Sequence, residues 1–498
     1  MTTYNKIFTV LHLSDLHRNE DGEVKNDQLL TSLVLDSDNY TNPNFENIPR
    51  PNLIIISGDL IYGSRNPDDN LAFNEVREQY KEAISFLDML AIEFFDGDKS
   101  KIIIVPGNHD VSWNISKKSM EKVDHILMSE TEQKSYTKNI SDPKTSIRWS
   151  WDELNFYKIK DEIIYNSRME LFSEFYENFY EGNRKYSLNP DEQFEIFEIP
   201  LYNLTVVGYN SCFRNDHMNH SGLINSKCLS ASYNQIRKYQ KKGRLLFATW
   251  HHNFSGIPSD DTYLDPRQLK SLNSYGFLIG FHGHQHHSDI VENYVQFDNS
   301  KKIIAISAGT LCSARSHLPT GYKRQYNLLR LDYIQKTCEL YSRESIGNME
   351  DIPIWDKGRI NESMSSKFSL EINFPDRLSI PDITMNEIDS LTILLKDKNY
   401  SELLNLLKNI STENELVRSI IVEFDDNTNG KFRDEICQIL VEPEQIRESI
   451  IFLDYYIEKR MKKEASIVLN NALAKLSDQP LLIAELNKYK KRIHGYSK

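Results

Sequence analysis

The chain has 498 residues and a formal net charge of −13 at pH 7. Its length exceeds what one hydrophobic core usually supports, so we expect two domains or one domain with large insertions. Its negative charge argues against broad attraction to nucleic acid or an anionic membrane. The five cysteines are widely spaced and form no CxxC pair, which argues against a disulfide framework or a thiolate zinc site. No apolar run approaches the roughly 18 residues of a spanning helix, and residues 1–14 lack a signal-peptide pattern, so we expect a cytoplasmic protein without membrane contact.

Three predicted strands in the first part of the chain end in polar side chains. They cover residues 7–13, 53–57 and 102–105, and each is rich in β-branched or other apolar residues, as is typical of strands buried on both faces. The side chains that follow them are, in chain order, Asp15 and His17, then Asp59, then Asn108, His109 and Asp110. Helical spacing over residues 71–95 places a helix between the second and third strands and predicts a parallel crossover.

Two later predicted strands, residues 245–250 and 277–281, end in histidines. His251 and His252 follow the first of them, and the second leads into the sequence HGHQHH, which contains His284 and His286. Side chains placed just beyond the ends of parallel strands lie at one edge of the sheet. The sequence therefore predicts that five strand ends carry potential metal ligands.

The remaining ranges predict an insertion, further strands and a helical tail. Residues 112–191 are rich in aromatics, partly at helical spacing, and predict a helical insertion over the site, with core packing as the main use of the aromatic stripe. Further strands are expected at residues 204–208, 303–307, 326–331 and 337–342. Residues 343–381 are polar and poorly periodic and are interpreted as a linker. Residues 382–498 show helical spacing without strand signals and predict an all-α domain.

Seven of these side chains form a set of oxygen and nitrogen donors without a thiolate: Asp15, His17, Asp59, Asn108, His251, His284 and His286. Such a set suits hard or borderline divalent cations, of which Mn, Fe and Zn are the candidates. One ion cannot use all seven donors, but two ions bridged by a carboxylate can. A pair about 3.5–4 Å apart would stabilise both the attacking and the leaving oxygen of a displacement at phosphorus.

The motifs D-x-H, G-D, G-N-H-D, a later H and G-H-x-H, in this order, resemble the calcineurin-like metallophosphoesterase superfamily. The resemblance covers about residues 7–342. It implies an α/β fold, a four-layer metallophosphoesterase sandwich of two mixed β-sheets flanked by helices, over residues 1–342. The all-α domain of residues 382–498 would be an addition to that sandwich.

The resemblance also implies a role for each matching residue. Asp15, His17 and His286 would bind one metal ion, Asn108, His251 and His284 would bind the other, and Asp59 would bridge the two ions. Mn is favoured as the metal, and a hydroxide shared by the ions would be the nucleophile. His109 matches the family's histidine that is not a ligand, and it would steady the phosphate or protonate the leaving oxygen.

Other polar residues near these motifs have two interpretations. Asp110 would either accept a hydrogen bond from His109 and fix its tautomer or cap backbone amides in the turn. His252 would contact the substrate or support His251. Asn210 and Arg315 would bind substrate, with loop closure as the alternative for such polar residues.

The expected activity is hydrolysis of a phosphodiester, because residues 11–17 (LHLSDLH) resemble the cyclic-nucleotide phosphodiesterase branch. The substrate would be a phosphoester, with nucleotides and nucleic acids as candidates. One alternative is a DNA or RNA nuclease like the double-strand-break repair branch, although Arg18 and Asn19 depart from that branch's pattern and the net charge is negative. Another alternative is an effector subunit that is recruited to a protein partner, or self-associates, through residues 382–498.

Overall fold

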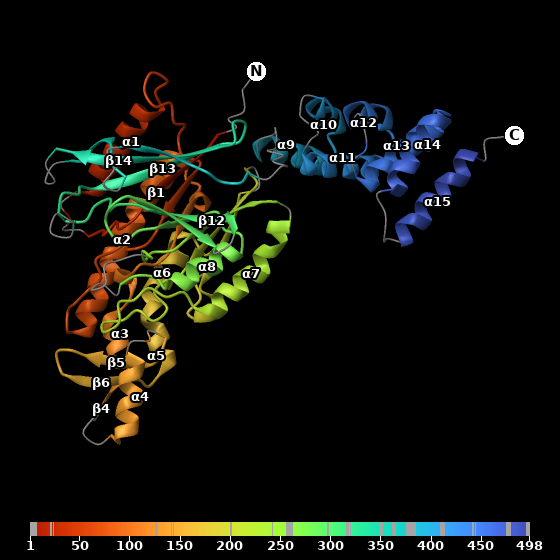
Figure 1. The fold of residues 1–498 in the computed structure, drawn as a ribbon. Helices are drawn as coiled ribbons and strands as arrows, with labels where there is room; N and C mark the ends of the chain where they lie inside the picture. The colour runs from red at the N-terminus through yellow and green to blue at the C-terminus, as the bar shows by residue number, and fades with distance from the viewer. Residues whose placement is uncertain are drawn as a thin grey trace. The chain divides into compact units, whose positions relative to one another are not determined.

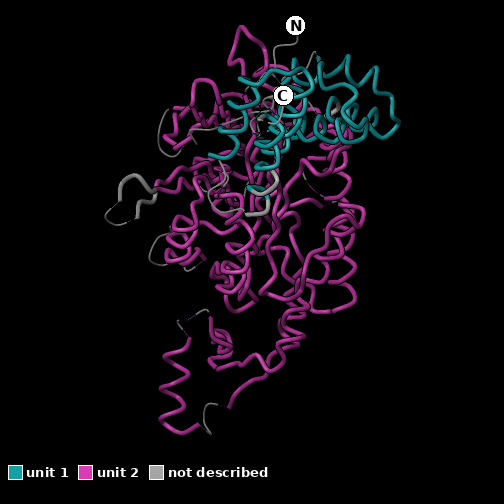
Figure 2. The backbone as a smooth tube through the Cα atoms, turned by 90° about the vertical axis from the view of Figure 1, so that its right-hand side faces the viewer, with its two compact units in different colours: residues 1–4, 379–498 teal, residues 5–378 magenta. Residues whose placement is uncertain are grey.

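The computed structural model describes the following residues: 7–19, 22, 24–124, 128–140, 142, 144–199, 202–241, 243–254, 262–295, 298–314, 318, 320–347, 352–360, 365–374, 385–408, 414–440, 443, 445–474 and 480–494. These residues form two compact units, which divide between residues 378 and 379 (Figure 2). Among the described residues, no helix is both long and apolar enough to cross a membrane.

The unit of residues 5–378 contains a seven-stranded mixed sheet. Its strand order is β15 (Ile354–Lys357), β14 (Thr337–Ile346), β13 (Gln325–Asp332), β1 (Ile7–Leu13), β2 (Leu53–Ile56) and β3 (Ile102–Ile104), and β16 (Lys367–Leu370) also pairs with β14. β1, β2 and β3 run parallel, whereas β13 pairs with β1 antiparallel. Every residue of β2 and β3 is buried, which explains their uninterrupted apolar sequences.

A six-stranded sheet faces the first one. Its order is β11 (Asp289–Val295), β12 (Asp298–Ser307), β10 (Ile279–His282), β9 (Leu245–Thr249), β8 (Leu204–Tyr209) and β7 (Phe194–Ile199). The inner four strands are parallel and the two outer strands pair antiparallel. The two sheets meet through side chains such as His12 on β1 and Phe281 on β10, whose ring centroids are 5.0 Å apart.

Helices cover the outer face of each sheet (Figure 1). α1 (Asn26–Thr41) and α2 (Asp69–Phe95) connect the parallel strands of the first sheet, and α7 (Ser226–Lys241) and α8 (Pro266–Ser274) connect those of the second. Because parallel crossovers share one hand, the two helices of each pair lie on the same face of their sheet. The predicted four-layer sandwich is confirmed.

The inserted range 112–191 contains strands as well as helices. α3 (Trp113–Lys118), α4 (Glu130–Ile140), α5 (Glu162–Asn166) and α6 (Glu170–Phe179) accompany a three-stranded sheet of β4 (Met120–Val123), β6 (Asn155–Ile159) and β5 (Ile147–Ser150). The expected insertion is therefore not purely helical. β4 escaped prediction because it is short and half charged, with no buried residue to reveal a period of two. The aromatic stripe of α6 is buried as core, as its first interpretation held.

The range 343–381, expected as a linker, contributes to the seven-stranded sheet. It holds the end of β14 and the two strands β15 and β16, and Trp355 of β15 packs at 4% exposure against the sheet and donates a hydrogen bond to Ser32 of α1. Its polar composition reflects the position of β15 and β16 at the border of the sheet, where most of their side chains face solvent. Sheet structure therefore continues to Leu370.

The described residues of the unit that begins at residue 379 form helices, which confirms the predicted all-α region. They are α9 (Met385–Lys396), α10 (Tyr400–Leu407), α11 (Glu415–Thr428), α12 (Arg433–Leu440), α13 (Ile446–Glu458), α14 (Lys462–Ala474) and α15 (Pro480–His494). They share a hydrophobic core that includes Leu403, Leu407, Leu453 and Leu486. A buried ion pair between Arg418 and Glu448, 2.8 Å apart, links α11 to α13.

A buried ionic cluster fastens α1 to the first sheet and yields a stability prediction. Arg343 on β14 donates to Asp36 of α1 at 2.9 Å and to Glu46 at 2.7 Å, and the Tyr326 hydroxyl also donates to Asp36. Replacing Arg343 with leucine would leave the Asp36 carboxylate buried without its cation, so we expect a loss of about 3–5 kcal/mol in the free energy of unfolding.

Urea unfolding of the Arg343→Leu variant measures this loss. The matched control is Arg77→Leu, because Arg77 pairs with Glu174 at 2.8 Å while both side chains are more than 40% exposed. Exposed pairs contribute about 1 kcal/mol or less. Equal losses of unfolding free energy in the two variants would show that the buried cluster stabilises the fold no more than an exposed ion pair does.

Candidate metal centre

The seven predicted donor side chains lie at the carboxyl ends of five parallel strands. Asp15 and His17 follow β1, Asp59 follows β2, Asn108 follows β3, and the histidines follow β9 and β10. Asp15, His17, Asp59 and His251 are at most 2% exposed. The two sheets meet at this edge, so that residues separated by up to about 270 positions are brought together.

Asp15, His17 and His286 form the first group, and their donor atoms lie within 4.8 Å of one another. His286 Nε2 is 3.1 Å from Asp15 Oδ1, and His17 Nε2 is 3.9 Å from the same oxygen. His17 Nδ1 lies 3.2 Å from the Ile61 carbonyl oxygen, which can only accept, so Nδ1 carries the proton. The lone pair is then on Nε2, which is buried without a hydrogen-bond partner, as expected of an atom reserved for a cation.

Asp59, His251 and His284 form the second group. His251 Nε2 is 3.2 Å from Asp59 Oδ2 and 2.9 Å from Asn108 Oδ1, and His284 Nδ1 is also 2.9 Å from Asn108 Oδ1. His251 Nδ1 donates to the Ser57 carbonyl at 2.8 Å, which turns Nε2 toward the group. Asp59 also belongs to a third cluster with His17 and His109, so it lies between the two groups.

Most of the donor residues have strained backbones. Asp15, His17, Asp59, His284 and His286 have φ angles of 51°, 43°, 51°, 73° and 59°, in the left-handed region that side chains with a Cβ rarely adopt. Each such residue costs about 1–3 kcal/mol and persists only where the surrounding structure imposes it, which is common at functional sites. The rigid strand ends therefore hold the donors in place at an energetic cost.

Electrostatics in the site favours anionic carboxylates and neutral imidazoles. Burial alone would raise the pKa of Asp59, but the facing His251 and His109 hold it well below its usual value. Burial lowers the pKa of His17 and of His284 to about 3, so both rings are neutral at pH 7. His251 is the exception, because against the effect of burial the Asp59 charge raises its pKa to about 9. A cation between these two residues would replace that proton.

These donors fit divalent cations. The set combines two buried carboxylates, an amide oxygen and imidazoles whose second nitrogens, at His17 and His251, are already occupied by backbone carbonyls. The unpartnered Nε2 of His17 would be costly in a site that never held a cation. Nitrogen and oxygen donors without thiolates suit Mn, Fe or Zn.

Gly107 lets the turn after β3 approach Asp59. A methyl group at its Cα would lie 2.1 Å from Asp59 Oδ1, although its backbone is in an ordinary conformation. We expect Gly107→Ala to displace the Asp59 carboxylate and to lower bound metal and activity about 10–100-fold, as loss of a partner of a metal ligand does.

Metal analysis of the purified Gly107→Ala protein checks this expectation. Gly97→Ala is the control, since Gly97 has a φ of +89° but an added methyl group meets no atom within 4 Å. It separates backbone strain from collision with Asp59. Full metal content in Gly107→Ala would show that metal binding does not require the Asp59 carboxylate to keep its present position.

His109 faces the donors from the end of β3. Its Nδ1 donates to the Tyr62 carbonyl at 2.8 Å, and its Nε2 lies 3.9 Å from Asp59 Oδ2. The His109 side chain is 31% exposed. Its own backbone N–H donates to Asp59 Oδ1 at 2.9 Å. The ring is thus fixed in one tautomer by a carbonyl group, with Nε2 directed at the site.

Asp110 does not contact the His109 ring, contrary to the first interpretation of its role. Its carboxylate accepts from the backbone N–H of Gly107 at 2.8 Å and of Leu60 at 3.4 Å, and from the Tyr80 hydroxyl at 3.1 Å. Burial, followed by the Asp59 charge, raises the pKa of Asp110 to about 7. The alternative, a carboxylate that caps backbone amides, describes this geometry.

Two of the three residues expected to bind substrate, His252 and Asn210, have hydrogen-bond partners within the protein. Both nitrogens of the buried His252 have protein partners, Ser211 Oγ at 2.8 Å and Asn215 Nδ2 at 3.4 Å. Asn210 donates to Gln193 at 2.8 Å and accepts from the Cys212 N–H at 2.7 Å, so it organises its own loop. Arg315 lies outside the described residues. The contacts of His252 agree with its second interpretation, support of the His251 segment, and those of Asn210 agree with loop closure.

Two supporting groups could not be read from the sequence. The Tyr62 carbonyl fixes His109, and the Tyr62 ring stacks on His17 at 4.8 Å. Ser211 Oγ accepts the backbone N–H groups of His251 and His252 at 3.1 and 3.2 Å. A serine in a polar loop and a backbone carbonyl carry no sequence signal of such a function.

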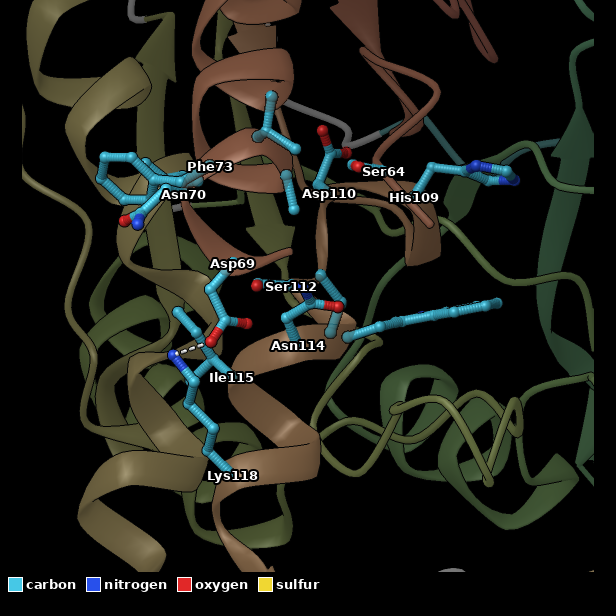
Figure 3. A pocket seen from close by; sticks show the side chains of 15 residues that line it. Ser64, Asp69, Asn70, Phe73, His109, Asp110, Ser112, Asn114, Ile115 and Lys118 are labelled. Atoms are coloured by element: carbon cyan, nitrogen blue, oxygen red, sulfur yellow. Dashed lines mark ion pairs between the residues drawn. The ribbon is translucent and has the colours of Figure 1, made fainter. Parts of the chain in front are cut away.

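A hollow of about 330 Å³ begins beside His109 and extends between α2, α3 and the start of α6 (Figure 3). Its lining residues are Ser64, Asp69, Asn70, Ala72, Phe73, Val76, His109, Asp110, Val111, Ser112, Trp113, Asn114, Ile115, Lys118 and Leu171. We call it the His109 hollow. A smaller hollow of about 30 Å³ shares Ser64, His109, Val111 and Trp113 with it and reaches Asn108.

The family model of calcineurin-like phosphoesterases matches residues 8–288. The chain belongs to this family. As a calcineurin-like phosphoesterase it is a metal-dependent phosphoester hydrolase, and its two donor groups correspond to the dimetal site typical of the family.

Individual proteins of known structure resemble this calcineurin-like phosphoesterase only at low sequence identity. No curated protein matches it significantly. Similar solved structures include a dimetal phosphatase from Danio rerio, 13% identical with a TM-score of 0.37, covering 68% of this chain and 96% of that one. The protein TT1561 of Thermus thermophilus is 10% identical with a TM-score of 0.30, and the match covers 69% of this chain and 99% of TT1561. The calcineurin-like phosphoesterase YfkN from Bacillus subtilis is 12% identical with a TM-score of 0.28, and the match covers 85% of this chain and 97% of YfkN.

Proposed function

We propose that this metallophosphoesterase is a phosphodiesterase with two divalent metal ions, and that Mn is the favoured metal among Mn, Fe and Zn. The observation that carries the proposal is the convergence of the two donor groups on Asp59. Asp15, His17 and His286 would hold one ion, Asn108, His251 and His284 would hold the other, and Asp59 would contact both. Bound metal ions supply Lewis acid chemistry, which polarises phosphoryl oxygens and activates water.

His109 is the residue proposed to act directly on the substrate. Because the Tyr62 carbonyl holds Nδ1–H, the exposed Nε2 is the nitrogen that can donate to a phosphoryl oxygen or to the leaving oxygen. Asp59 accepts the His109 backbone N–H and so couples the position of this residue to the donors. Asp110 would act through the turn, by holding the amides of Gly107 and Leu60.

A singly charged diester fits the cations beside His109 better than a doubly charged monoester. The lysine and arginine side chains that line the two hollows are Lys118 and Arg65, and Lys118 is paired with Asp69 at 2.6 Å. Of these two described cations, Arg65 is then the one available to an anionic ligand.

Metal reconstitution tests the proposal. The protein is stripped with a chelator, reloaded with Mn, Fe or Zn, and assayed on bis(4-nitrophenyl) phosphate and on 4-nitrophenyl phosphate. We expect about two metal ions per chain and faster turnover of the diester, with Mn the most active metal. Faster turnover of the monoester with every metal would contradict the phosphodiesterase assignment.

We also propose that residues 382–498 act as an interaction or self-association domain. Their helices bury a hydrophobic core of their own and include the buried Arg418–Glu448 pair, which supports independent folding. Sedimentation of the whole chain is compared with that of a chain ending at residue 378. Identical monomeric behaviour, with no partner captured by the whole chain, would count against this role.

All five cysteines are free and buried, which supports a reducing compartment such as the cytoplasm.

A further inference from the structure

A short segment between β8 and α7, residues 210–215, contacts the histidines that follow β9. Ser211 of this segment is fully buried, and its Oγ accepts the backbone N–H groups of His251 and His252 at 3.1 and 3.2 Å. The same oxygen lies 2.8 Å from His252 Nδ1. One hydroxyl group therefore fixes the backbone at His251, a proposed ligand of the second metal ion.

The 210–215 segment also contacts the turn that carries Asn108. Cys212 is fully buried, and its Sγ lies 3.9 Å from the Pro106 carbonyl oxygen, two positions before Asn108. One segment thus lies beside two proposed ligands of the same ion, His251 and Asn108.

The ligands proposed for the first metal ion are held by other parts of the chain. The backbone N–H groups of Asp15 and His17 donate to the carbonyls of Gly58 and Asp59 at 3.1 and 3.0 Å. The Asp15 carbonyl accepts the Thr310 hydroxyl at 2.8 Å. These partners follow β2 and β12, so a shift of the 210–215 segment should disturb the second ion more than the first.

Arg168, between α5 and α6 of the inserted range, holds the 210–215 segment. It is 2% exposed, and its guanidinium donates to three carbonyls of the segment, those of Cys212 at 3.0 Å, Asn215 at 3.1 Å and Phe213. It also donates to the Tyr165 carbonyl at 2.8 Å and lies 3.9 Å from the centre of the Tyr165 ring. All these acceptors are backbone oxygens, so the side chain fixes the path of the main chain.

A second buried link joins the inserted range to the end of this segment. Asp216 is fully buried and accepts from Arg148 Nε of β5 at 2.8 Å and from the Tyr165 hydroxyl at 2.8 Å. Tyr165 therefore contacts both Asp216 and Arg168. Buried polar networks whose members are paired are rigid, so the inserted range supports the 210–215 segment firmly.

We propose that Arg168 is a positioning residue for the second metal ion. By holding the carbonyls of the 210–215 segment, it keeps Ser211 where its hydroxyl receives the His251 backbone N–H. The inference rests on the proposed function, which makes His251 a ligand of that ion. Arginine suits the role because its planar group directs five N–H donors, whereas lysine has three on one nitrogen atom.

Calorimetric titration of the chelator-stripped protein with Mn²⁺, and separately with Zn²⁺, tests the proposal. We expect two binding steps in the unmodified protein. In Arg168→Lys one Kd should rise about 10–100-fold, the usual cost of losing a group that supports a ligand, while the other changes less than about 2-fold. The metal concentration for half-maximal activity should rise, whereas activity at saturating metal should return to that of the unmodified protein.

Arg214→Lys is the matched control for Arg168→Lys. Arg214 lies in the same segment and pairs with Glu162 of the inserted range at 2.9 Å, but the Glu162 side chain is 51% exposed. Both metal Kd values should therefore stay unchanged in Arg214→Lys. Urea unfolding of each variant separates a change in metal affinity from a loss of fold.

Ser211→Ala tests the same route at its other end. It removes the hydroxyl but keeps the carbonyls that Arg168 holds, and it should raise the same Kd as Arg168→Lys does. Because both changes act on one route, the double variant should exceed the more affected single variant by less than about 3-fold, whereas independent effects would multiply. If Arg168→Lys does not fold, Ser211→Ala alone decides, since the proposal requires it to weaken one ion.

Three results would overturn the inference while two metal ions still bind to the unmodified protein. They are an equal rise of both Kd values in Arg168→Lys, factors that multiply in the double variant, and unchanged affinities in the single variants. Binding of fewer than two ions by the unmodified protein, with either metal, would instead contradict the proposed function on which the inference rests.

Discussion

Replacing Asp59 with asparagine should lower kcat/KM by more than about 100-fold, because even loss of a group that merely supports a metal ligand costs 10–100-fold. Asp59 lies between the two donor groups, 3.2 Å from His251 Nε2 and in one cluster with His17 and His109. Asparagine has nearly the same shape but lacks the negative charge. Metal content measured together with steady-state kinetics should show loss of about one ion per chain or more.

The control for this variant is Asp38→Asn. Asp38 is 65% exposed in its side chain and lies 3.7 Å from Arg50 on the surface, so removing its charge should leave both measurements unchanged. If Asp59→Asn kept two metal ions and full activity, Asp59 would not bridge the groups. The division of donors into two sets would then need to be redrawn.

Replacing His109 with asparagine should lower kcat by about 10²–10⁴-fold, the usual contribution of a positioned acid or base, without loss of metal. The ring is held by the hydrogen bond from Nδ1 to the Tyr62 carbonyl, and its Nε2 stays 3.9 Å from Asp59 Oδ2, beyond hydrogen-bond distance, so we expect its removal to leave the donors in place. The decisive measurement is the pair of values, kcat and metal ions per chain. Added imidazole should restore part of the activity.

A histidine close in sequence to a proposed ligand serves as the control for His109. His287 donates from Nδ1 to the Gln285 carbonyl at 2.9 Å and packs on Tyr322, so His287→Asn should change kcat by less than about 3-fold, the effect of an ordinary supporting contact. Loss of metal from His109→Asn would show that His109 is a ligand. Unchanged kcat would remove it from the chemistry.

The candidate donor residues could be predicted from the sequence because each is a potential metal ligand that follows directly after an apolar strand. A buried strand such as Leu53–Ile56 needs apolar residues, and the first charged residue after it, Asp59, is therefore easy to find. The same reasoning reached Asp15 and His251. The candidate metal site is spread over five strand ends, yet each part is local in sequence.

Features that depend on distant partners could not be predicted in this way. Asp110 looks like a partner for its neighbour His109, but its carboxylate is held by Tyr80, 30 positions earlier, and by backbone amides. α1 has no clear apolar stripe because its buried face includes Asp36 and Ser32, whose partners are Arg343 and Trp355. The His109 hollow likewise exists only because α2, α3 and α6 meet.

The pairing of β1 with β13 also matters for synthesis of the chain on the ribosome. β1 is synthesised before its antiparallel partner, Gln325–Asp332, which follows roughly 300 residues later, a delay on the order of 15–60 s at about 5–20 residues per second. During that time one edge of β1 has no native partner, and an apolar strand with an open edge can pair with other chains. Protection of the nascent strand by a chaperone, or slow translation after residue 332, would therefore influence the yield of active enzyme.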